Sequence, residues 1–247
     1  MTTPKIIPPV NLPPPEKGRI APRPKLAATI VLLRERGGQT QILMGKRSAR
    51  HDFMPSVYVF PGGRVDRSDS IAPAADHISA RTREILEAAM TPARARACVM
   101  AAVRETFEET SLVLGEKFDT PPKAVNDPSW QDFHKLGYVP TLSDIEVFGR
   151  AITPPYRHKR FDTWFFVAQL DDQVSNRHVK DSAELLDTNW FGFDEIDDLE
   201  THRATQMMLA QLKIYLALDH PPRDVFFSRV YRRRFQFSRF PDRDTHV

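Results

Sequence analysis

Residues 92–114 combine an apolar stripe with a cluster of carboxylates, and this pattern constrains the fold more than any other in the chain. The apolar side chains recur at the spacing of one buried helical face, and they are Val99, Met100, Val103 and Phe107. Thr91 and Pro92 supply an N-cap and a first-turn proline, and Gly115 suits a left-handed helix end. We therefore predict one helix over residues 92–114, packed by its apolar face against a hydrophobic core.

The carboxylates of this helix share another face. Glu105, Glu108 and Glu109 stand at positions i, i+3 and i+4, so they lie on the same side and repel one another. Such a cluster is either a solvated acidic surface or a site for hard divalent cations, which take carboxylate oxygens and substrate phosphates as ligands. The upstream turn at Gly62-Gly63, where backbone can come close to a ligand, favours the cation site.

Shorter patterns predict a strand-rich chain around this helix. Residues 25–33 and 41–46 are expected to form a hairpin through Gly37-Gly38, and short helices are expected within residues 77–90 and 128–136. Further strands are predicted at 57–60, 145–152, 161–170 and 188–191, before a helical stretch over 194–219.

Length and composition indicate one enlarged domain, because 247 residues with 41% apolar side chains can bury a sizeable core. The proline-rich residues 1–24 are predicted to be a surface arm, 25–220 the domain, and 221–247 a basic tail. The lone Cys98 allows no internal disulfide, and we find neither a membrane span nor a signal peptide, so we expect a cytoplasmic protein without a membrane partner. A net charge of +3 does not demand a nucleic-acid partner, and a homodimer stays open.

The segment around the carboxylates resembles the signature of the Nudix hydrolases. That signature is a glycine, five residues, Glu, seven residues, Arg-Glu, an apolar residue, any residue, Glu-Glu, any residue, glycine and an apolar residue. Matching residues here are Gly62-Gly63, Arg104-Glu105, Glu108-Glu109 and Leu112. Thr106 and Ser111 replace the apolar residue and the glycine, and the missing glycine at 111 predicts that the helix continues to Gly115.

The two halves of the signature are split by an insertion. Gly63 and Arg104 are 104 − 63 = 41 positions apart where the signature needs 14, so 41 − 14 = 27 residues are added. We place the insertion at about residues 67–90 and expect it to pack beside the active-site mouth and shape substrate choice. The first-half Glu has no counterpart, because Arg96 stands eight positions before Arg104.

Other runs resemble the branch related to coenzyme A diphosphatases, which includes an animal acyl-CoA diphosphatase type with a similar insertion. They are residues 46–48, 51–55, 59–63 with Asp66, 152–155, 160–163 and 165–166. The resemblance implies an α+β fold, a mixed sheet sandwiched between helices. It also implies Mg²⁺- or Mn²⁺-dependent hydrolysis of a nucleoside diphosphate linked to another group, with coenzyme A or acyl-CoA as the leading substrate. ADP-ribose or dinucleotide hydrolysis, and a catalytically weak binding or regulatory module, are the alternatives.

The resemblance also assigns roles to single residues. It implies that Glu105, Glu108, Glu109 and a carbonyl of the turn at Gly62 hold the metal, while Arg104 pairs with a carboxylate and fixes the geometry of the cluster. The general base is Glu184, from a later loop, or Glu105. Substrate phosphates could contact Lys46, Arg47 and Arg160, although exposed charges at strand ends are an equal alternative.

Overall fold

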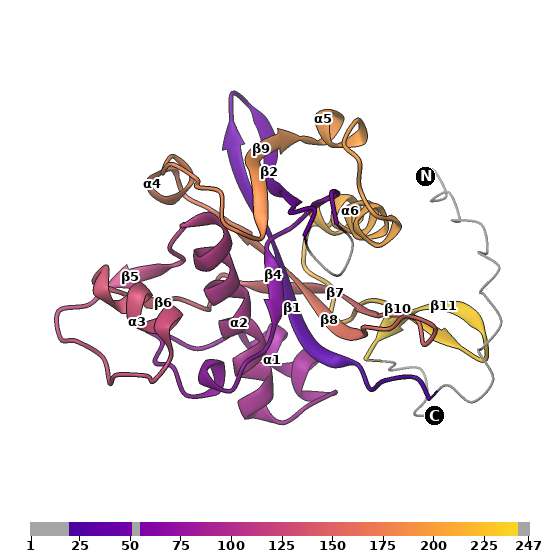
Figure 1. Ribbon diagram of the computed structural model, residues 1–247, viewed down its shortest axis with the longest axis horizontal. Coiled ribbons are helices and arrows are strands. Elements are labelled where there is room, and N and C mark those ends of the chain that lie inside the picture. Colours follow the sequence, from indigo (N-terminus) through magenta and orange to yellow (C-terminus); the bar gives the residue numbers. More distant parts are fainter. Residues whose placement is uncertain (1–19, 51–54, 242–247) are drawn as a thin grey trace.

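The computed structural model describes residues 20–50 and 55–241, and a mixed β-sheet forms its centre (Figure 1). The strands of this sheet are β1 (Lys25–Arg36), β2 (Gln39–Arg47), β3 (Tyr58–Val59), β4 (Gly62–Arg64), β7 (Glu146–Ile152), β8 (Phe161–Gln169), β9 (Leu185–Gly192), β10 (Val225–Tyr231) and β11 (Arg234–Phe240). Their order is β11-β10-β7-β8-β1-β2-β3, with β4 beside β1 and β9 beside β2. A separate two-stranded sheet joins β5 (Gly115–Lys117) to β6 (Tyr138–Pro140).

Helices cover both faces of the large sheet. They are α1 (Ala80–Glu87), α2 (Pro92–Thr110), α3 (Pro128–Lys135), α4 (Asp172–Ser175), α5 (Phe193–Asp197) and α6 (Arg203–Leu216), with a 3₁₀ turn, η1, at Ser68–Ser70. Figure 1 shows α6 on the opposite side of the strands from α1 and α2. None of the helices in the described ranges combines the length and apolar character that crossing a bilayer needs.

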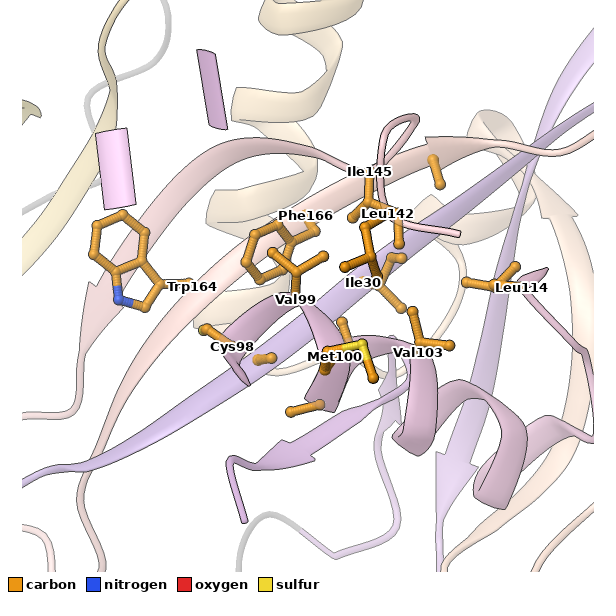
Figure 2. Packing of buried hydrophobic residues seen from close by; sticks show 14 of the residues in the cluster. Ile30, Cys98, Val99, Met100, Val103, Leu114, Leu142, Ile145, Trp164 and Phe166 are labelled. Atoms are coloured by element: carbon orange, nitrogen blue, oxygen red, sulfur yellow. The ribbon is translucent and has the colours of Figure 1, made fainter. Parts of the chain in front are cut away.

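Alternation along β1 produces the two halves of the core. Ile30 and Leu32 point to the face covered by α2, whereas Val31 and Leu33 point to the face covered by α6. Figure 2 shows Cys98, Val99, Met100 and Val103 of α2 packed against Ile30, Trp164 and Phe166 of the strands. The α+β arrangement of a sheet between helices is therefore confirmed, and Cys98 is a buried thiol whose pKa is raised by burial.

Several locally encoded elements are confirmed. Gly37 and Gly38 adopt φ values of +61° and +76° and join β1 to β2 as a hairpin, α1 lies within the insertion, and α3 begins at Pro128. The helix expected over residues 92–114 begins at Pro92 but ends at Thr110. Ser111 itself takes the left-handed position, with φ +62°, and its N–H bonds the carbonyl of Phe107, so the helix does not wait for Gly115.

The C-terminal segment differs from the predicted tail. Residues 221–247 were expected as a basic tail, yet β10 and β11 form a hairpin in the main sheet and β10 pairs in parallel with β7. Val225 and Phe227 alternate along β10 and give it a buried face, at 1% and 6% exposure. Of the expected arm, residues 1–19 lie outside the described residues, and β1 begins at Lys25.

Candidate active site

The C-terminal half of α2 lies against the glycine turn, because β4 pairs with β1 and carries Gly62 and Gly63 to the helix. The N–H of Gly62 donates a 2.8 Å hydrogen bond to Oε2 of Glu109. Gly62 has φ +153°, and a side chain there would overlap the backbone of Ala28 and Thr29. A side chain at Gly63 would overlap the carboxylate of Glu105. Both glycines are therefore needed for the close approach of turn and helix.

Arg104 connects the carboxylates of this region. Its Nη1 donates to Oε1 of Glu105 at 2.9 Å and to Oε2 of Glu108 at 3.1 Å. Its Nε and Nη2 donate to the two oxygens of Asp69 at 2.8 and 3.1 Å, and Nη2 also reaches the carbonyl of Arg64 at 2.8 Å. Arg104 is 4% exposed, so these bonds hold a buried guanidinium between the glycine turn and the acidic cluster.

Asp69 is the acidic residue that the sequence interpretation missed. It is 0% exposed, and besides Arg104 it accepts hydrogen bonds from Nε1 of Trp130 at 3.2 Å and from the N–H of Asp66 at 2.8 Å. Five residues separate Gly63 from Asp69, which is the spacing of the signature's first-half acid. The insertion therefore follows Asp69, with 104 − 69 − 1 = 34 residues before Arg104 where the signature has seven. Arg96, eight positions before Arg104, instead donates to the carbonyls of Asp69 and Ala72.

Two carboxylates of α2 have raised pKa values. Burial raises the pKa of Glu105 to about 7, against the opposing effect of Arg104 and with repulsion from Glu108. Burial and repulsion from Glu105 raise the pKa of Glu109 to about 8, against the hydrogen bond from Gly62 and the charge of Arg47. A cation between these side chains would stabilise their ionised forms, so the donor set fits a hard divalent ion.

The acidic side chains of α2 are nevertheless not arranged as a preformed metal site in the described residues. Within residues 20–50 and 55–241, no three His, Cys, Asp or Glu side chains converge closely enough to hold a metal ion. Arg104 draws Glu105 and Glu108 toward itself, and the N–H of Gly62 occupies Glu109. Each of these bonds uses one oxygen of its carboxylate, so cation binding would require the other oxygens of Glu105, Glu108 and Glu109 to converge.

A cleft of about 760 Å³ opens on this junction. Of the residues predicted for the site, those that line it are Gly62, Arg104, Glu105, Glu108, Glu184 and Arg47. Glu109 lies behind the lining at 7% exposure. The charge of Glu184 contributes to the raised pKa of both Glu105 and Glu109, and this indicates that Glu184 faces the cluster from the β9 side.

Lys46 and Arg160, the other two predicted phosphate contacts, lie outside the lining. The Nζ of Lys46 is 6.0 Å from the ring centroid of Tyr58. Arg160 donates from Nε to the carbonyl of Thr153 at 2.9 Å and from Nη1 to that of Pro22 at 2.9 Å. These bonds tie the chain before β1 to the β7–β8 connection, which is a structural use of the guanidinium.

The insertion lies elsewhere than expected. Residues 70–90 contribute nothing to the cleft lining. Instead α1 packs on α2 with Ile85 and Leu86 buried, while Arg81 and Thr82 both bond Oε2 of Glu146 at 2.8 Å. The inserted segment therefore supports α2 and does not form the mouth of the cleft.

The cleft continues into a region that sequence patterns did not reveal. Its further lining residues include Arg157 and Lys159 from the β7–β8 connection, Arg203 at the start of α6, and Phe235 and Phe237 of β11. These segments are far apart in sequence, and the order of strands in the sheet brings them together. No local sequence motif therefore predicts this part of the cleft.

Comparisons with known proteins agree with this fold. No family model matches the chain. A nudix hydrolase from Caenorhabditis elegans is 28% identical over 185 residues, covering 70% of this chain and 53% of that protein. An acyl-coenzyme A diphosphatase from Gallus gallus is 25% identical over 227 residues, covering 71% of this chain and 59% of that protein. The chain thus spans little more than half the length of these relatives.

A solved structure shares the fold of this chain. The crystal structure of a nudix hydrolase from Alicyclobacillus acidocaldarius superposes with a TM-score of 0.57 at 22% identity, covering 76% of this chain and 90% of that one. The Nudix fold is therefore confirmed, as is the sequence resemblance to Nudix hydrolases and to a branch that contains an acyl-CoA diphosphatase.

Proposed function

We propose that this chain, which has the Nudix fold and resembles Nudix hydrolases in sequence, hydrolyses the diphosphate of a nucleoside diphosphate linked to another group. The observation that carries the proposal is the junction of the Gly62-Gly63 turn with the carboxylates of α2 inside a 760 Å³ cleft. That volume suits a ligand of nucleotide size, since small-molecule sites typically occupy about 300–1,000 Å³.

The chain's own residues divide the work as follows. Glu105, Glu108 and Glu109 would hold Mg²⁺ or Mn²⁺, with a carbonyl of the glycine turn as a further ligand. When bound, the cations neutralise charge on the diphosphate oxygens and favour attack by water on phosphorus. Arg104, fixed by Asp69, keeps the acidic side chains at the glycine turn. Arg47 lines the cleft and would contact a substrate phosphate.

Glu184 and Glu105 are the two candidates for the general base. Both line the cleft, and burial raises the pKa of Glu105 to about 7, within the range suited to proton transfer at neutral pH. Glu184 lies just before β9, and its charge acts on both Glu105 and Glu109. A Glu184→Gln variant with normal metal affinity and low kcat would assign the base to this residue.

Coenzyme A or an acyl-CoA is the leading substrate. The similarity to the Gallus gallus acyl-coenzyme A diphosphatase supports this choice. The test is a screen of coenzyme A, acyl-CoA, ADP-ribose and dinucleotides with Mg²⁺ and Mn²⁺, with products resolved by mass in ¹⁸O-labelled water. We expect coenzyme A to yield 4′-phosphopantetheine and 3′,5′-ADP. Cleavage of ADP-ribose or a dinucleotide alone would change the substrate, and binding without any cleavage would favour a regulatory module.

A further inference from the structure

One part of the cleft carries three cationic side chains from two separate segments. Arg157 and Lys159 come from the β7–β8 connection, Arg203 is the first residue of α6, and all three line the cleft. Burial is the main cause that lowers the pKa of His202, and the charges of Arg157 and Arg203 lower it further. Both side chains therefore lie near this histidine. A phosphate placed among these side chains would be attracted by all three positive charges.

Strand register gives the separation between Phe161, the first residue after the cationic connection, and Gly63, which lies beside the acidic end of α2. Gly63 pairs with Ala28 of β1 and Phe161 pairs with Lys25, so the two points differ by three residues along β1. Three residues span roughly 10 Å, and the two strand spacings from β4 to β8 add roughly 10 Å across, which gives about 14 Å on the diagonal. Arginine side chains of the connection can reach back over about half of that distance.

That separation fits a nucleotide with a second phosphate group. A ribose that carries a 5′-diphosphate and a phosphate on a ring hydroxyl places the two phosphorus atoms six bonds apart, roughly 7 Å at about 3.5 Å per three bonds. With the diphosphate at the α2 carboxylates, the second phosphate would therefore lie within reach of Arg157 and Arg203. Planar guanidinium groups bind such a phosphate with paired hydrogen bonds.

Aromatic rings adjoin the cationic group on the sheet side. The guanidinium of Arg203 lies 5.5 Å from the ring centroid of Phe235. Phe235 and Phe237 are nearly parallel, with an interplanar angle of 13°, and Phe237 remains 42% exposed. A flat ring surface beside a phosphate-binding group suits the base of a nucleotide. The β10–β11 hairpin thus completes a nucleotide-binding end of the cleft.

We propose that Arg157, Lys159 and Arg203 bind a phosphate monoester on the ribose of the substrate. This subsite would select nucleoside diphosphate derivatives that carry a 3′-phosphate over those that lack it. The inference rests on the proposed diphosphate hydrolysis for its placement, and it adds the chemical group by which substrates are distinguished. It assigns a specificity role to the β7–β8 connection and the start of α6, which line the same cleft as Glu105 and Glu108.

Coenzyme A and 3′-dephospho-coenzyme A test the subsite, because they differ only in this phosphate. We expect kcat/KM of the wild type to be at least tenfold higher for coenzyme A. Arg157→Ala and Arg203→Ala should each lower kcat/KM for coenzyme A by about 10- to 100-fold, the usual effect of losing one charged hydrogen bond. Both variants should leave the dephosphorylated substrate within about threefold of wild type. Arg157→Lys should recover part of the preference.

Arg83→Ala is the matched control, since Arg83 is an exposed arginine on α1 outside the cleft lining, and it should change neither substrate. Unfolding midpoints of all variants exclude a loss of folding, which matters for Arg203 at the start of a helix. A wild type that cleaves both substrates equally, or variants that lose both equally, would overturn the subsite.

A binding measurement separates the subsite from the reaction. Calorimetric titration with 3′,5′-ADP and with 5′-ADP should show tighter binding of 3′,5′-ADP to the wild type, and Arg157→Ala should remove the difference. If no diphosphate is cleaved but this preference holds, the proposed function fails while the subsite stands. If coenzyme A is cleaved and the two nucleotides bind equally to wild type and variant, the subsite fails while the proposed function stands.

Discussion

Replacing Asp69 with Asn tests the buried charge network behind the α2 carboxylates. Asp69 is 0% exposed and accepts bonds of 2.8 and 3.1 Å from Arg104, which is itself 4% exposed. The substitution preserves shape but removes the negative charge opposite a buried guanidinium. Breaking one side of a buried pair costs about 3–5 kcal/mol. We expect the lower end, about 3 kcal/mol of unfolding free energy, because the Asn oxygen still accepts one bond.

Asp66→Asn supplies the matched control on the same arginine. The Asp66 side chain is 47% exposed and lies 4.0 Å from Nη2 of Arg104, so its loss should cost less than about 1 kcal/mol. Urea unfolding of the metal-free proteins gives both values from the midpoint and slope. Asp69→Asn should also lower kcat, since Arg104 would no longer be held beside Glu105 and Glu108. Equal losses of stability in the two variants would refute the argument that burial sets the strength of this pair.

Two further predictions concern the same site. In chelator-treated protein, burial raises the pKa of Glu105 from 4.5 to about 7 and that of Glu109 from 4.5 to about 8. At pH values between the unfolded and folded pKa values, the folded state therefore binds more protons than the unfolded state. Stability should then fall as pH rises from about 5 to 8, and Glu109→Gln should flatten that slope in thermal melts; identical slopes would contradict the assignment. Gly63→Ala should displace the Glu105 carboxylate and lower kcat about tenfold or more, with an unchanged circular dichroism spectrum. Wild-type turnover in this variant would show that the close approach of Gly63 to Glu105 is not needed.

Local signals in the sequence predicted the elements that local chemistry determines. The Gly37-Gly38 turn, the proline that begins α3 and the apolar stripe of α2 each act within a few residues, and each element is present. The end of α2 was misplaced because Ser111 adopts a left-handed conformation that glycine usually supplies. The hairpin of β10 and β11 was missed for a similar reason. Its turn residues, Arg232 and Arg233, have φ values of +46° and +64°, which arginine seldom adopts.

Long-range contacts explain what else the sequence did not reveal. Asp69 was overlooked because the search ran backward from Arg104 across the insertion, whereas counting forward from Gly63 reaches Asp69 after five residues. Arg157 and Arg203 are 203 − 157 = 46 positions apart, and only the folded chain brings their charges to His202. The carboxylates of α2 could be predicted because their spacing lies on one helix.

The central claim is that the α2 carboxylates hold the divalent cation needed for diphosphate hydrolysis, and Glu109→Gln tests it most directly. The glutamine oxygen can still accept the Gly62 hydrogen bond, so folding should be preserved while one ligand charge is lost. Turnover of coenzyme A should depend on Mg²⁺ or Mn²⁺ in the wild type and fall about 10²- to 10³-fold in the variant, equivalent to roughly 3–4 kcal/mol. Glu116→Gln, at an exposed site on β5, should match the wild type. A folded Glu109→Gln protein with more than about a third of wild-type activity, a loss of under roughly 0.7 kcal/mol, would contradict the account.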